Sequence, residues 1–311
     1  MTSGDPLQPA SGPAPADPEE LEARHSPGRA EISALTTVGA VHVTVSELER
    51  SVAYYRSAIG LDLLERRDGR ASLGAGAREL LVLVEEAGAR PAAGHTGLYH
   101  FALLLPRRAD LARWLAHAAR DRVRLVGLSD HFVSEALYLS DPDGHGIEIY
   151  WDRPREVWEG QVGSRLTTLP LDVDSLLKEL DDPASEPFER LPAGTVMGHV
   201  HLKVAVIPET VTFYRDALGF ALMAQLASQA AFFGAGGYHH HVGANIWESA
   251  GALPPPPGSA ALRHATILLP DTEERERVIR RLEELEAAPQ ETASGPMVRD
   301  PSGNALLLAV A

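Results

Sequence analysis

The sequence contains no cysteine, and this absence removes several classes of chemistry at once. A chain without thiols has no disulfides, no thiolate metal sites and no cysteine nucleophile. No apolar run approaches the length of about 18 residues that a transmembrane helix needs, so we expect no membrane span. The N-terminus lacks a basic segment followed by an apolar one, so no secretory signal is predicted and a cytoplasmic location is expected.

Basic residues are scarce relative to acidic ones. Lys and Arg number 28 against 43 Asp and Glu, which gives a formal net charge of −15. Such a charge argues against nucleic acid and anionic membranes as partners. Apolar residues make up 44% of the 311 positions, enough for two domains of ordinary size. Without thiolates, any bound metal must be held by imidazole and carboxylate groups, which suit Fe(II), Mn(II), Ni(II) or Zn(II).

The chain divides into segments of different composition. Residues 1–32 are rich in Pro, Ala, Gly and acidic residues, so we expect a disordered tail. Folded domains are expected over residues 33–152 and 194–311. The polar connector between them, residues 153–193, contains one amphipathic stretch, Val173–Leu180.

The two expected domains are copies of one another. Residues 41–64 align without a gap on residues 200–223, an offset of 159, and nine of the 24 positions are identical. Residues 141–150 align on residues 300–309 at the same offset. Similar segments that recur in the same order and at the same offset indicate an internal duplication.

Each domain is in turn built from two copies of a smaller module: a strand, a helix and three further strands. In the first copy, alternation over residues 41–45 predicts a strand. Helical periodicity follows over residues 47–59, with Ser46 placed to cap the helix and Gly60 to end it. The expected fold class is therefore α+β, with four βαβββ modules. These modules cover approximately residues 38–86, 97–152, 196–248 and 261–310.

The order of these features resembles the vicinal oxygen chelate superfamily. Its modules have a first strand that carries His, then a helix that ends near a Gly, and later an Asp-Pro-x-Gly turn before a strand with Glu. That superfamily includes glyoxalase I, drug-resistance proteins and extradiol dioxygenases. Residues 97–106, 134–150 and 236–247 are most similar to the catechol 2,3-dioxygenase branch. The resemblance implies that modules pair into two curved mixed sheets, with a metal inside the concave face of one of them.

The resemblance also implies an Fe(II) site made of two His and one Glu, with Mn(II) as the alternative metal. Counting back 15 residues from Tyr214, as the family's spacing requires, selects His199 as the ligand from module three. Module two supplies His100 and Glu148, whereas Leu307 stands at the equivalent of the Glu in module four. We therefore expect modules two and three to pair face to face and to form the metal site.

Further roles follow from the same resemblance. Tyr138 and His131, which precede the carboxylate ligand in the chain, are expected to position the substrate oxygens. A histidine of module three is expected to act as the acid–base residue, and three are consecutive. Spacing favours His241, and alternation along a strand would put His239 on the same face and His240 on the opposite one. The choice among the three stays open.

These residues predict an extradiol ring-cleaving dioxygenase of aromatic catabolism, which inserts both atoms of O2 into a small catechol-type aromatic diol. A hydroquinone substrate stays open. One alternative is a glyoxalase-like isomerase or lyase that uses Zn(II), Ni(II) or Co(II), although such enzymes use a Glu where this chain has the consecutive histidines. Another is a non-catalytic protein that binds an aromatic compound or a drug. By analogy with the family a homo-oligomer is expected, and modules one and four resemble a decayed copy of the active pair, retained for structure.

Overall fold

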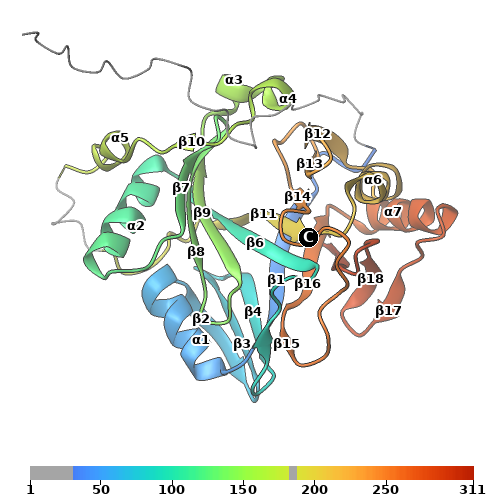
Figure 1. Ribbon diagram of the computed structural model, residues 1–311, viewed down its shortest axis with the longest axis horizontal. Helices are drawn as coiled ribbons and strands as arrows, with labels where there is room; N and C mark the ends of the chain where they lie inside the picture. Colours follow the sequence, from blue (N-terminus) through green and yellow to red (C-terminus); the bar gives the residue numbers. More distant parts are fainter. Residues whose placement is uncertain (1–30, 182–187) are drawn as a thin grey trace, which may run out of the picture.

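Modules one and four form one curved sheet in the computed structural model, which describes residues 31–181 and 188–311 (Figure 1). Module one comprises β1 (Thr37–Val45), α1 (Leu48–Tyr54), the π-helical turn η2 (Tyr55–Ile59), β2 (Asp62–Arg67), β3 (Arg70–Ala75) and β4 (Arg78–Glu85). Module four comprises β16 (Leu262–Leu269), α7 (Thr272–Glu284), β17 (Gln290–Thr292), β18 (Gly295–Arg299) and β19 (Ala305–Val310). The eight strands run in the order β17-β18-β19-β16-β1-β4-β3-β2.

Modules two and three form the second sheet. Module two comprises β6 (Gly97–Leu104), α2 (Arg108–Arg120), β7 (Gly127–Asp130), β8 (Ser134–Ser140) and β9 (Gly146–Asp152). Module three comprises β11 (Val196–Lys203), α6 (Ile207–Val211), the π-helical turn η3 (Thr212–Ala217), β12 (Ala221–Leu226), β13 (Ala230–Gly234) and β14 (Val242–Asn245). With β10 (Leu169–Pro170) at one edge, the nine strands run in the order β10-β7-β8-β9-β6-β11-β14-β13-β12.

The remaining elements connect the modules. In its described part, the connector carries three short helices besides β10, namely α3 (Arg155–Trp158), α4 (Val162–Arg165) and α5 (Val173–Leu177). A two-stranded sheet joins the loops at β5 (Arg90–Pro91) and β15 (Ser259–Ala260). Most of the expected tail, residues 1–30, and residues 182–187 of the connector lie outside the described residues. None of the described helices is both long and apolar enough to cross a bilayer.

The predicted α+β class, with four βαβββ modules in two curved mixed sheets, is confirmed. Modules two and three do pair, but the expected face-to-face arrangement is wrong. Their first strands, β6 and β11, are hydrogen-bonded neighbours in one antiparallel register. Edge-to-edge pairing satisfies the backbone groups that an unpaired first strand would leave open. Ligands from both modules therefore lie on one continuous sheet.

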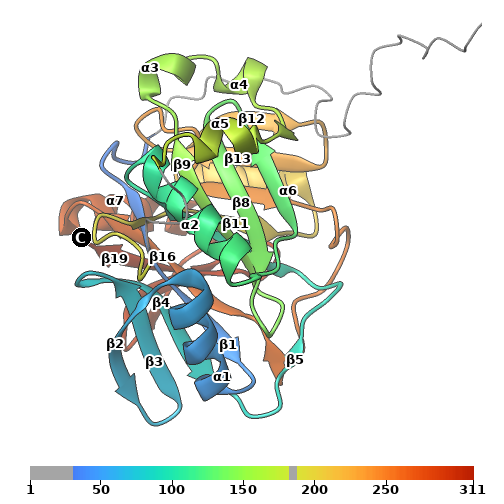
Figure 2. The ribbon, with the colours of Figure 1, turned by 90° about the vertical axis from the view of Figure 1, so that its left-hand side faces the viewer.

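The two sheets share a buried core where β1 and β11 lie against each other. Val41 and Val43 of β1 are fully buried, as are Val200 and Leu202 of β11. Because side chains alternate along a strand, the intervening residues of β11 point away from this core. Figure 2 shows α1 lying over the sheet of module one and α2 lying over the sheet of module two. The concave face of the nine-stranded sheet is left for a site.

The first helix begins differently from the prediction. Ser46 does not cap it, because its hydroxyl donates to Asp143 at 2.6 Å. The backbone N–H of Leu48 donates instead to the carboxylate of Glu85, at 2.9 Å. The helix ends at Gly60, as expected, and the φ of 90° there is a conformation that glycine adopts without strain. Ser46 is thus used to hold the loop of the neighbouring module.

Candidate metal centre and active site

Three adjacent strands bring two histidines and one glutamate together. His199 of β11, Ala102 of β6 and Glu148 of β9 form one lateral row across the sheet. The small side chain of Ala102 leaves the space between its two larger neighbours open. His100, two residues earlier on β6, enters that space on the same face. The side chains of His100 and Glu148 from module two and of His199 from module three therefore point toward one another.

The ligand atoms meet at short distances. Oε2 of Glu148 lies 2.9 Å from Nε2 of His100 and 3.0 Å from Nε2 of His199. The two Nε2 atoms are 3.3 Å apart. An octahedral face with metal–ligand bonds of about 2.1 Å has edges of about 3 Å. Within the described residues, these three side chains are the one set of three or more with metal-ligating atoms this close together.

The charge state of the group suits a divalent cation. Burial alone would raise the pKa of Glu148, yet contacts with His199 and His100 outweigh it and hold that pKa well below its usual range. Burial lowers the pKa of His199, although Glu148 opposes the effect. An ionised carboxylate and imidazole nitrogens are the donors of the two-His-one-carboxylate sites that bind Fe(II). The residues present therefore fit the metal that the sequence predicts.

A cavity of about 430 Å³ opens above the triad. This volume lies within the usual range for small-molecule sites. Tyr138 of β8 is directly opposite Glu148 in the β8–β9 ladder, so its ring enters the cavity beside the carboxylate. His131, His201 and His240 also line it. Around the Glu148 carboxylate, the candidate substrate space is thus bounded by imidazole and phenol groups.

Tyr138 and His131 form a hydrogen-bonded pair. The hydroxyl of Tyr138 lies 2.7 Å from Nε2 of His131, and Nδ1 of His131 lies 2.9 Å from the carbonyl of Thr167. A carbonyl only accepts, so Nδ1 carries the proton and Nε2 of the neutral ring accepts from the phenol. The connector residue Thr167 thereby sets the tautomer of His131 and the direction of the Tyr138 hydroxyl.

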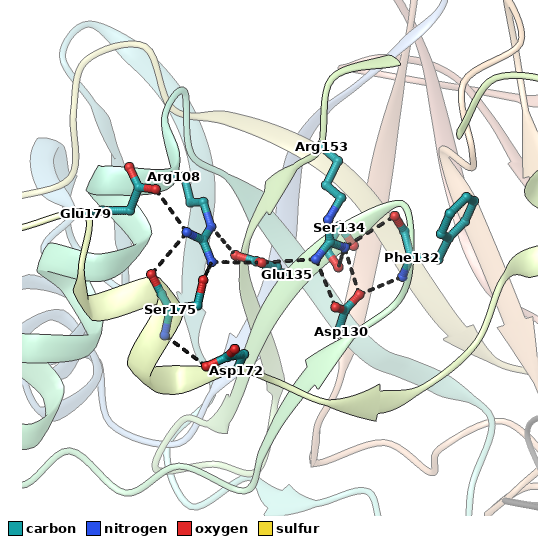
Figure 3. Close-up of polar contacts among 9 residues, drawn as sticks. All are labelled: Arg108, Asp130, Phe132, Ser134, Glu135, Arg153, Asp172, Ser175 and Glu179. Carbon is teal, nitrogen blue, oxygen red and sulfur yellow. Dashed lines mark hydrogen bonds and ion pairs between the residues drawn. The ribbon is translucent and has the colours of Figure 1, made fainter. Parts of the chain in front are cut away.

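The loop that carries His131 is held by an ion-pair network (Figure 3). Arg153 donates to both carboxylate oxygens of Asp130, at 2.7 and 2.8 Å, and to the carbonyl of Phe132. Glu135, which is buried, accepts from Arg153 and from Arg108. Bidentate pairs of this kind order a loop more than single contacts do. The network fixes the backbone on both sides of His131.

The consecutive histidines do not follow the expected alternation. They lie in the turn after Gly236 and Gly237, whose φ values are 57° and 72°, and β14 begins only after them. His240 lines the cavity, and its ring centre lies 4.2 Å from that of His199. His241 does not line it, because its Nδ1 accepts from the backbone N–H of Ala235. Of the three histidines, His240 therefore lines the cavity, and which of them acts as the acid–base residue stays a prediction.

His239 lies behind His240. Its Nδ1 is 2.8 Å from Nδ1 of His240, and its Nε2 is 2.9 Å from a carboxylate oxygen of Asp152. A carboxylate accepts, so Nε2 of His239 donates to Asp152, and one proton lies between the Nδ1 atoms of His239 and His240. Burial, together with the neighbouring imidazoles, lowers the pKa of His240 well below its usual value, which favours its neutral form.

Several residues that line the cavity were not assigned a role from the sequence, among them His201 and Lys203. His201 and Lys203 follow His199 at intervals of two and four on β11, so the face they share was readable from strand alternation. Nε2 of His201 is buried without a hydrogen-bond partner among the described residues. Trp247, whose ring packs against that of His201 at 5.7 Å, closes the same end of the cavity.

The model of the Glyoxalase/Bleomycin resistance protein/Dioxygenase superfamily matches residues 37–149 and 196–308. The chain therefore belongs to this superfamily, and each match covers one pair of consecutive modules. A catechol-2,3-dioxygenase of Bacillus subtilis (strain 168) is 40% identical over 278 residues, which are 88% of this chain and 96% of that protein.

Solved structures of low identity share the fold. A putative dioxygenase from Bacillus subtilis subsp. subtilis str. 168 superposes with a TM-score of 0.59 at 16% identity, covering 88% of this chain and 85% of that one. Glyoxalase I from Zea mays gives a TM-score of 0.53, also at 16% identity, covering 88% and 92%. These two likenesses support the fold alone, since one architecture carries different chemistries.

Proposed function

We propose that the protein is an Fe(II)-dependent extradiol dioxygenase that cleaves the ring of a catechol-type diol next to its hydroxyls. The observation that carries the proposal is the convergence of His100, Glu148 and His199 on one point at the base of the cavity. The name of the relative at 40% identity, a catechol-2,3-dioxygenase, supports the same reaction class. Both atoms of O2 enter the ring-opened product, so the reaction needs no external reductant.

His100, Glu148 and His199 would hold the metal. When bound, Fe(II) supplies open coordination positions for a bidentate diol and for O2, and carries electrons between them. The protein contributes a buried cavity and a carboxylate that stays ionised.

The remaining cavity residues handle protons and orientation. The neutral imidazole of His240, which lines the cavity, accepts a proton from a diol hydroxyl and returns it to the product. Tyr138, directed by His131, positions a substrate oxygen by hydrogen bonding. Each of these residues lines the cavity or touches one that does.

The glyoxalase-like alternative has less support. Among the described residues that line the cavity, the acidic side chains are Glu148 and Glu248. Glu248 is paired with Lys203 at 3.8 Å, and its side chain is 61% exposed, so it is no counterpart of a second buried ligand. Where the glyoxalase-type pattern has that ligand, this chain has the consecutive histidines, of which His240 lines the cavity.

Oxygen uptake tests the proposal. Protein loaded anaerobically with Fe(II) is mixed with catechol and air-saturated buffer, and oxygen is followed with an electrode while the yellow ring-opened product is followed by absorbance. We expect both signals in the wild type and neither in Glu148→Gln, because the amide removes the anionic ligand. Absence of uptake with catechols and hydroquinones, with Fe(II) still bound, would exclude the dioxygenase.

A further inference from the structure

One cation lines the cavity. Among the described residues that form its wall, Lys203 is the single Lys or Arg side chain. The chain holds only two lysines, Lys178 and Lys203, so the basic residues are otherwise arginines. The side chain of Lys203 is only 12% exposed. A charged group withdrawn this far from water is costly unless an anion accompanies it.

The partner that Lys203 has in the protein is a weak one. Its ammonium lies 3.8 Å from the carboxylate of Glu248, beyond hydrogen-bonding distance, and Glu248 is 61% exposed. Exposed carboxylates are screened by water and contribute little to such pairs. The cation therefore keeps most of its capacity to attract a second anion on the cavity side.

The position of Lys203 relative to the triad defines the shape of that anion. His199 and Lys203 are four residues apart on β11, about 13 Å between Cα atoms at about 3.3 Å per residue. His201 lies between them on the same face, and the rings of Tyr99 and Trp247 pack around it at 5.3 and 5.7 Å. A flat aromatic body thus suits the middle of the span, with a chelating end at the triad.

We propose that Lys203 forms a carboxylate subsite, so that the preferred substrates are catechols with a short acidic substituent. This inference rests on the proposed function for the diol end of the ligand. The diol lies at the triad, the ring lies against the aromatic wall, and the carboxylate pairs with the Lys203 ammonium. Glu248 would repel the same carboxylate and moderate the preference.

Binding without turnover provides the first test. The probes are 3,4-dihydroxyphenylacetate and its methyl ester, which differ mainly in charge, titrated by calorimetry into Fe(II)-loaded protein without oxygen. A charge-assisted hydrogen bond corresponds to a preference for the acid of about 10-fold or more. We expect this ratio to collapse toward one in Lys203→Met, to rise in Glu248→Gln and to stay unchanged in Lys178→Met. An unchanged ratio in Lys203→Met overturns the subsite.

Chemical labelling of the wild-type protein gives a second test that does not depend on a folded variant. Reductive methylation is followed by peptide mass spectrometry, and the exposed Lys178 serves as the internal control. The acid is expected to slow the labelling of Lys203 at least several-fold relative to Lys178, and the ester to slow it less. Equal protection of Lys203 by acid and ester contradicts the proposal.

The two proposals fail in different ways. Cleavage of catechol, with no preference for the acid, removes the subsite and leaves the dioxygenase. Acid-selective binding that depends on Lys203, without oxygen uptake on any diol, removes the dioxygenase and leaves an anion subsite in the same cavity.

Discussion

Replacing His100 by glutamine should abolish tight metal binding. Nε2 of His100 is one of three ligand atoms, 2.9 Å from Glu148 and 3.3 Å from His199. The amide of glutamine is a poor substitute for an imidazole nitrogen, so two ligands would remain. Loss of a group that only orients a metal-binding residue lowers metal affinity about 10- to 100-fold. Loss of a metal-binding residue itself should therefore lower metal affinity at least about 100-fold, which corresponds to about 2.7 kcal/mol.

The duplication supplies a matched control. His264 occupies in β16 the place that His100 has in β6, and each is paired with a histidine on the neighbouring first strand. At the equivalent of Glu148, however, module four has Leu307. His264→Gln therefore makes the same chemical change on an equivalent strand without touching a carboxylate. We expect its metal affinity to equal that of the wild type.

Metal affinity is measured with Co(II), followed by visible absorption, and with Fe(II) against a competing chelator without oxygen. Thermal unfolding adds an independent readout, because metal at 100 times its dissociation constant stabilises the folded state by about 2.7 kcal/mol. This shift should appear in the wild type and in His264→Gln and be absent from His100→Gln. If both variants lost metal affinity to the same extent, or if neither lost it, the assignment of the metal centre to the nine-stranded sheet would be refuted.

Three further predictions concern stability. Glu135→Gln removes the buried carboxylate that two arginines share and should cost about 3–5 kcal/mol in urea unfolding, whereas Glu159→Gln, at an exposed ion pair, should cost less than about 1 kcal/mol. Gly198→Ala places a Cβ against the hydroxyl of Tyr150 and should lower stability by about 1–3 kcal/mol, measured the same way. Burial, and to a smaller extent Arg263, lower the pKa of His264 from 6.5 to about 4 in the folded protein. As the pH falls from about 6.5 to about 4, the unfolded chain therefore binds a proton at His264 and the folded protein does not, so the free energy of unfolding decreases. The loss in unfolding temperature between about pH 7 and pH 5 should be smaller in His264→Gln than in the wild type; an equal loss would contradict this cause.

The clustering of His100, Glu148 and His199 could be predicted from the sequence because strand alternation and the internal duplication point to the same residues. Strand alternation puts every second residue on one face, and the offset of 159 shows which copy keeps His199 and Glu148 and which has lost them. His100 then follows as the first-strand histidine of module two. The structure places all three as neighbours without any contribution from loops.

The acid–base residue was less accessible to the same reasoning. Alternation holds only inside a strand, and the positive φ of Gly236 and Gly237 turns the chain immediately before the three histidines. His241 is directed to a backbone N–H and His240 to the cavity. The link from Thr167 to His131 joins residues 36 apart through tertiary folding, which no local pattern encodes.

Module one contacts the turn that precedes the candidate metal centre. Tyr55, on η2, donates to Asp141 at 2.8 Å, and Arg50 and Ser46 bind Asp143 in the turn that leads into β9. Tyr214 repeats the first contact with Asp300 of module four, in both cases across 86 residues. The same contact is therefore present in both halves of the chain, with and without an adjacent His–Glu–His triad.

Sequence-adjacent modules are thus joined by the tyrosine–turn contact, while the sheets join module two to three and one to four. The turn at Asp141 directly precedes β9, the strand that carries Glu148, so the contact from Tyr55 of module one restrains the position of the Glu148 carboxylate. Module one thus contributes to the geometry of the candidate metal centre although its own strands supply none of the three side chains of the triad.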